Sequence, residues 1–161
     1  MKITIVGMGA LGILYGERIT STLGKEAVTF LADTERVKKY HKEGVFCNGK
    51  QCDFIVTDKA EVADLLIFAV KGTTLQEAME LAKDAVGEET ILLSVLNGIS
   101  SEEMMAEYFD KGHIVHCIAQ GMDAVKLGNE LTYAHEGELR IGTPDLADKM
   151  YVERAAEMLK K

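Results

Sequence analysis

The sequence predicts an α/β fold with a doubly wound, mostly parallel sheet, and three observations support this prediction. Short, nearly continuous apolar runs alternate along the chain with segments of helical periodicity, as in successive βαβ units. A glycine-rich loop joins the first apolar run to the first helical segment. The 161 residues, 47% of them hydrophobic, suffice for one domain with a sizeable core. We therefore expect a single domain over residues 1–161.

Five apolar runs are predicted to form the parallel strands. They comprise residues 3–6, 27–32, 65–70, 91–96 and 114–118. Strands that helices cover on both faces of a sheet carry apolar side chains on both sides, so they lack the polar and apolar alternation of a half-exposed strand. Their composition favours a sheet buried between two layers of helices.

Helices are predicted between these strands from apolar residues spaced three to four positions apart. The first begins at Leu11 and ends at Gly24, which suits a left-handed cap. The second begins at Asp33 or Thr34. Two later helices have the spacing of a capping box at their start, Thr73 with Gln76 and Ser100 with Glu103.

One β-hairpin is predicted to be inserted after the second helix. Asn48 and Gly49 lie between two short stretches within residues 45–52. An Asn-Gly pair suits the two-residue turn of a hairpin, because both positions need a positive φ.

A second hairpin and a last helix are predicted near the C-terminus. Glu136 and Gly137 separate residues 131–135 from residues 138–141, again in a hairpin pattern. The last helix is expected to open at Thr143 and Pro144 and to end at Lys161, since proline suits the first helical position.

The glycine-rich loop has the spacing of a dinucleotide-binding site. It consists of Gly7, Met8, Gly9, Ala10, Leu11 and Gly12, after a strand and before a helix. Gly7 allows the tight turn, Gly9 lets a pyrophosphate approach the backbone, and Gly12 lets the helix pack close to the strand. Free N–H groups and the positive dipole end of the helix favour the phosphates. The loop indicates a Rossmann-type fold; a turn without a ligand is the alternative.

Asp33 ends the second strand and has two possible roles. Its distance from the glycine loop is typical of the carboxylate that accepts hydrogen bonds from the adenosine ribose, which points toward NAD. Asp also caps helices well, and the next helix begins at Thr34. Both roles remain open from the sequence.

Lys71, Asn97 and Gly98 follow two further strands, where open α/β sheets bind ligands. Lys71 is placed to reach the cofactor or an anionic substrate, although a solvated lysine at a strand end is the commoner case. Asn97 and Gly98 precede a helix, so the usual hairpin explanation of Asn-Gly does not apply. A local turn role for Asn97 stays equally open.

Composition argues against several other functions. A formal net charge of −8 and a pI near 5.0 do not suit nucleic-acid binding. No apolar run is long enough for a membrane span, and no signal peptide is recognised. Three cysteines without a Cys-x-x-Cys pair, and four histidines without ligand spacing, predict neither disulfides nor metal. We expect a soluble, cytoplasmic protein.

The chain resembles ketopantoate reductase, also called 2-dehydropantoate 2-reductase, in four ordered segments. They are residues 2–12, Ala69-Val70-Lys71, Leu96-Asn97-Gly98 and residues 137–142. The glycine motif is generic, whereas the ordered set with Lys71 and Asn97 is more specific. The resemblance covers essentially the whole chain but only the first half of the family, whose members continue into a helical domain.

The resemblance implies an NADPH-dependent reduction of 2-oxopantoate to pantoate, on the route to pantothenate and coenzyme A. It places Lys71 and Asn97 in the cleft beside the nicotinamide and the substrate. It assigns the general-acid lysine and a substrate-binding glutamate to the helical domain, so this chain alone is expected to be inactive. A homodimer is compatible with the resemblance.

Two alternatives remain from the sequence. Family members that use NADP commonly have arginine after the second strand, where this chain has Asp33, so the resemblance implies NADP while the residue favours NAD. The other function considered is a nucleotide-sensing regulatory domain, which shares the glycine motif and the acidic strand end. Lys71 and Asn97 favour the reductase, because a sensor needs no groups beside the reacting face of the nicotinamide.

Overall fold

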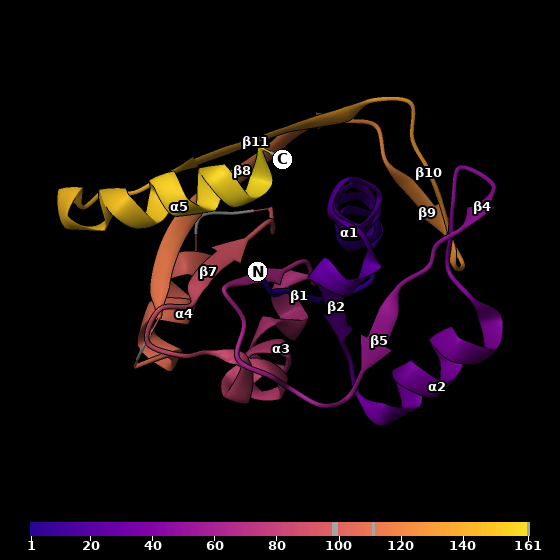
Figure 1. The fold of residues 1–161 in the computed structure, drawn as a ribbon, viewed down its shortest axis with the longest axis horizontal. Coiled ribbons are helices and arrows are strands. Elements are labelled where there is room, and N and C mark those ends of the chain that lie inside the picture. The colour runs from indigo at the N-terminus through magenta and orange to yellow at the C-terminus, as the bar shows by residue number, and fades with distance from the viewer. Residues whose placement is uncertain (98–99, 111, 161) are drawn as a thin grey trace.

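A seven-stranded, mostly parallel sheet forms the centre of the computed structural model, which describes residues 1–97, 100–110 and 112–160 (Figure 1). Its strands are β1 (Ile3–Val6), β2 (Val28–Leu31), β5 (Ile55–Thr57), β6 (Leu65–Phe68), β7 (Ile91–Ser94), β8 (His113–Met122) and β11 (Glu136–Gly142). Their order is β11-β8-β7-β6-β1-β2-β5, and only the β8–β11 pair is antiparallel. The predicted fold class is confirmed.

Helices cover both faces of the sheet. They are α1 (Ala10–Leu23), α2 (Thr34–Glu43), α3 (Leu75–Ala82), α4 (Ser101–Tyr108) and α5 (Lys149–Leu159). Successive strand residues point to opposite faces: Ile5 joins the cluster under α1 and α5, and Val6 joins the cluster under α3 and α4. Within the described residues, none of the helices has the length and apolar character needed to cross a bilayer.

The predicted strand positions agree with the structure, but their ends differ. The second, third and fourth predicted strands extend past the observed β2, β6 and β7 by one or two residues, because Val70 and Leu96 lie beyond the paired segments. The fifth is longer than predicted, since β8 continues to Met122 along β11. The short edge strand β5 was not predicted.

The inserted hairpin is confirmed. It consists of β3 (Phe46–Cys47) and β4 (Lys50–Gln51), with Asn48 at φ 49° and Gly49 at φ 79° in the turn. Both positive φ values match the turn type that Asn-Gly favours. The hairpin belongs to a second, four-stranded sheet in the order β4-β3-β10-β9, with β9 (Val125–Leu127) and β10 (Glu130–Thr132).

The predicted pairing of the C-terminal hairpin is wrong. Residues 130–132 pair with β9 and β3, while β11 pairs with β8. Gly137 lies inside β11 at φ 69°, and a Cβ there would lie 2.3 Å from the carbonyl oxygen of Gln120. The glycine is needed because two strands approach closely at this point. It does not mark a turn.

Two predicted helix starts are corrected, and one predicted capping bond is absent. A 3₁₀ turn, Gly72–Thr74, precedes α3, because the Thr74 hydroxyl donates to the Lys71 carbonyl oxygen. Ser100 stands at the N-cap of α4 without a side-chain cap bond. The last helix starts at Lys149 rather than Thr143, after a 3₁₀ turn in which the Ala147 backbone N–H donates to the Asp145 carboxylate. Its predicted end, Lys161, lies outside the described residues.

Candidate functional site

The loop between β1 and α1 requires glycine at its first position. Gly7 has φ 109°, a conformation that residues with a Cβ rarely adopt. A Cβ at Gly7 would also lie 2.5 Å from the carbonyl oxygen of Ala69. The chain therefore makes a tight turn directly beside the end of β6.

Gly12 and Gly9 differ in their surroundings. A Cβ at Gly12 would lie 2.0 Å from the Gly7 carbonyl oxygen, so α1 packs directly on the loop. A Cβ at Gly9 would meet only the Ala69 carbonyl oxygen, at an ordinary 3.5 Å. Gly9 is also the N-cap of α1 and has no side-chain oxygen for the first helical N–H groups. These groups are therefore available to an anionic ligand.

A cavity of about 890 Å³ opens at the carboxyl ends of the parallel strands. Its walls come from the glycine loop, the β2–α2 junction, the β6–α3 junction and the residues after β7. Every predicted site residue from Gly7 to Leu11 lines it, together with Asp33, Lys71 and Asn97. Gly12 lies in the first turn of α1 and is buried against the loop, outside the cavity lining. Gly98 lies outside the described residues.

Asp33 caps α2. One carboxylate oxygen accepts from the Arg36 backbone N–H at 2.8 Å, and the other lies 3.3 Å from Arg36 Nη1. The capping role considered from the sequence is thus observed. The Asp33 side chain remains 49% exposed and lines the cavity, so it stays accessible to a ribose hydroxyl.

Lys71 and Asn97 are both exposed at the edge of the cavity. The Lys71 carbonyl oxygen accepts from the backbone and the hydroxyl of Thr74, at 2.9 and 3.1 Å. These bonds hold the backbone of Lys71 while leaving its ammonium group in solvent. The structure therefore brings a cation and an amide to the same edge as the glycine loop.

Sequence reasoning missed the part of the cavity that two helices contribute. The additional lining residues include Arg36 and Tyr40 from α2 and Thr74, Glu77, Glu80 and Leu81 from the α3 region. The α3 residues share one helix face, at the spacing that places side chains on the same side. These residues do not lie at strand ends, so the strand-end pattern does not indicate them. Their helical spacing directly after Lys71 does indicate a helix face beside the site.

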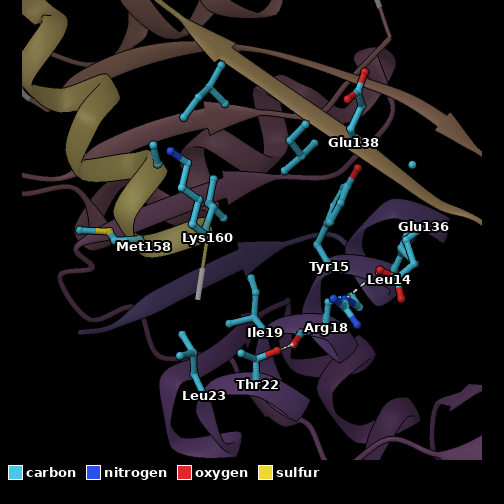
Figure 2. Close-up of a pocket in the computed structure, with 15 residues that line it drawn as sticks. Leu14, Tyr15, Arg18, Ile19, Thr22, Leu23, Glu136, Glu138, Met158 and Lys160 are labelled. Carbon is cyan, nitrogen blue, oxygen red and sulfur yellow. Dashed lines mark hydrogen bonds and ion pairs between the residues drawn. The ribbon is translucent and has the colours of Figure 1, made fainter.

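A second cavity, of about 340 Å³, contains none of the predicted site residues (Figure 2). It lies between α1, β11 and the last turn of α5, where Tyr15 extends from α1 toward β11. The Tyr15 hydroxyl is buried and has no hydrogen-bond partner among the described residues. Burial raises its pKa to about 12, so it stays protonated and offers no acid–base group near neutral pH.

The cysteines and the acidic side chains offer no other chemical centre. All three cysteines are free thiols, and burial raises the pKa of Cys117 to about 12. Over residues 1–97, 100–110 and 112–160, no group of histidine, cysteine and acidic side chains is arranged to hold a metal ion. The cavity at the strand ends is therefore the best-supported site.

Comparison with known proteins points to one family. The family model described as "Ketopantoate reductase PanE/ApbA" matches residues 3–145. The 2-dehydropantoate 2-reductase of Aquifex aeolicus (strain VF5) is 30% identical over 148 residues, which cover 89% of this chain and 47% of that protein.

Solved structures show the same fold. The 2-dehydropantoate 2-reductase from Geobacter metallireducens GS-15 has a TM-score of 0.79 at 25% identity, covering 99% of this chain and 55% of that one. A D-mandelate dehydrogenase solved with NADH and anilino(oxo)acetate has a TM-score of 0.82 at 20% identity, with 99% and 54% covered. The chain spans about half the length of these relatives.

Proposed function

The chain belongs to the ketopantoate reductase family, and on that premise we propose that it is the cofactor-binding part of an NAD(P)H-dependent 2-oxo acid reductase. The first candidate substrate is 2-dehydropantoate, as in the curated relatives. Larger 2-oxo acids are a second candidate, because a D-mandelate dehydrogenase of the same fold was solved with anilino(oxo)acetate.

One observation carries this proposal: a single cavity gathers the glycine loop, Asp33, Lys71 and Asn97. The open side of Gly9 and the uncapped start of α1 fit a pyrophosphate. When bound, a nicotinamide supplies the hydride that reduces the ketone carbon. Lys71 would then attract the anionic 2-oxo acid, and the Asn97 amide would orient it at the same edge. A nucleotide sensor needs neither group, so the reductase is favoured.

We further propose that NADH binds at least as well as NADPH. Asp33 can accept from a ribose hydroxyl, but it repels a 2′-phosphate. At about 5 Å and an effective dielectric of about 20 to 80, that repulsion is on the order of 1–3 kcal/mol, or about 5- to 150-fold in affinity. Arg36 offsets part of it, but its guanidinium is already paired with Asp33.

Titration of the chain with NADH and with NADPH, by calorimetry, tests both points. We expect saturable one-site binding of each, with the dissociation constant for NADH equal to or below that for NADPH. No binding of either nucleotide would refute the proposed function. A clear preference for NADPH would show that Asp33 serves only as the helix cap.

The assembly of the protein is also a proposal. One solved structure of the same fold, at 16% identity, is described as a dimeric ketopantoate reductase from Staphylococcus aureus. We propose a homodimer for this chain on that basis, and analytical ultracentrifugation distinguishes it from a monomer.

A further inference from the structure

Residues of two helices, α2 and α3, line the cavity together with the end of β2, and the charges that the two helices contribute are unequal. Asp33 and Arg36 contribute one wall, at the start of α2. Glu77 and Glu80 contribute the other wall, from one face of α3. In a dinucleotide-binding fold, the end of the second strand holds the adenosine ribose. The charged residues that line the cavity are thus three acids, all on these two walls, and two bases, Arg36 and Lys71.

These acids differ in how far their charge is compensated. Asp33 is paired with Arg36 at 3.3 Å. Glu80 accepts from the Lys83 ammonium at 2.6 Å and from the Tyr108 hydroxyl, and these bonds lower the pKa of Glu80. Within residues 1–97, 100–110 and 112–160, Glu77 has neither a hydrogen bond nor an ion pair, and it is exposed to the cavity. Glu77 is thus the acid on these two walls whose carboxylate no cation or donor of the described residues compensates.

We propose that Glu77 is a specificity-determining residue, which disfavours a 2′-phosphate on the adenosine ribose from the wall opposite Asp33. This inference rests on the proposed dinucleotide site. NADPH carries a 2′-phosphate of charge near −2 that NADH lacks, so a nearby carboxylate discriminates between them by repulsion. Asp33 shares its charge with Arg36, whereas no cation within the described residues pairs with the Glu77 carboxylate, so Glu77 adds a second source of repulsion.

The substitution Glu77→Gln tests the proposal, because it removes the charge and keeps the shape. Dissociation constants for NADH and NADPH are measured by calorimetry at low and high salt. We expect NADPH to bind about 3- to 10-fold more tightly than to the original chain, and NADH to change less than about twofold. Glu77→Lys should shift the ratio further in the same direction. The effect should shrink at high salt, since exposed charges are screened.

Glu88→Gln is the matched control. Glu88 is exposed, carries the same charge and lies outside the residues that line the cavity, so its substitution should leave both constants unchanged. An NADPH to NADH ratio in Glu77→Gln equal to that of the original chain overturns this inference alone. If the original chain binds neither nucleotide, the proposed function fails, and this inference fails with it.

Discussion

Three glycines of one loop are needed for three different physical reasons. Gly7 adopts a positive φ, Gly12 has no space for a Cβ, and Gly9 has space and an ordinary extended conformation. Gly9 is therefore the one glycine of the three that the fold itself does not require, and we expect its side of the loop to be where a ligand excludes a side chain. Substitutions at Gly9 should therefore affect binding, whereas substitutions at Gly7 and Gly12 should affect folding.

Gly9→Val should weaken dinucleotide binding strongly while the chain stays folded. The valine side chain would occupy the position of the pyrophosphate, and we expect affinity to fall at least tenfold. Its effect on stability should be about 1 kcal/mol, since valine is a poor N-cap residue. Calorimetric titration with NADH measures the first effect, and thermal unfolding measures the second.

Gly12→Ala is the contrasting variant. Its Cβ would lie 2.0 Å from a backbone oxygen, so α1 has to move, and overpacking of this kind costs about 1–3 kcal/mol or more. We expect a clearly lower melting temperature. Equal NADH affinity in Gly9→Val and in the original chain would show that the pyrophosphate does not lie on this loop.

At the scale of elements, the Asp123 carboxylate links the segment between β8 and β9 to the segment between β10 and β11. β8 and β11 extend past α1 toward β9 and β10 (Figure 1). Asp123 follows β8 and accepts from the backbone N–H groups of Ala134 and His135, at 2.8 and 2.7 Å, and lies 2.8 Å from His135 Nδ1. These bonds, chiefly those from His135, lower the pKa of Asp123 to about 2.

Asp123→Asn should therefore lower stability in a pH-dependent way. Because the folded pKa lies below the ordinary value of 3.8, the ionised Asp123 stabilises the fold fully above about pH 4, and this contribution is lost as the pH falls toward 2. Urea midpoints at pH 7, 4 and 2.5 should show a difference between variant and original chain that shrinks with acidification. Asp84→Asn, at an exposed carboxylate, should show no such trend; a constant difference for Asp123→Asn would contradict the assignment.

The two hairpins show which elements a sequence predicts. The Asn48-Gly49 turn depends only on local conformation, because the positive φ values of its two residues favour Asn and Gly. It was therefore predicted correctly. The prediction of a turn at Gly137 is wrong. Glycine is needed there because the opposite strand approaches closely at Gln120, not because the chain turns. A contact between strands distant along the chain leaves no periodic signal. The short strand β5 was missed for a related reason, because it is ordered by pairing with β2.

At the scale of the whole molecule, the candidate site was largely predictable because parallel strands bring their carboxyl ends to one edge. Asp33, Lys71 and Asn97 each follow a strand, so the topology alone places them around one cavity. The α3 wall with Glu77 was not predicted, because its position depends on how α3 packs across β1, β2 and β6. Helix packing is a tertiary property that a strand-end pattern does not contain.

We expect that this chain alone cannot catalyse the reduction of a 2-oxo acid. Ketone reduction places negative charge on the carbonyl oxygen, so the site needs a positioned acid as well as an oriented hydride. Two cations line the cavity: Arg36 is paired with Asp33, and Lys71 is exposed at the edge. The chain spans about half the length of its relatives, and the family resemblance assigns the proton donor to the other half.

The second half would also form the opposite wall of the cleft, which excludes water and holds the 2-oxo acid near the nicotinamide. Loss of general acid catalysis alone typically lowers rates by about 10²- to 10⁴-fold, and loss of positioning multiplies that factor. We therefore expect oxidation of NADH or NADPH by this chain with 2-dehydropantoate to stay near background at saturating cofactor. The comparison is the full-length Aquifex aeolicus relative, assayed alongside it. Turnover within about tenfold of that enzyme would mean that Lys71 or another group of this chain is the acid. The proton donor and the cofactor would then both lie at the carboxyl edge of this sheet.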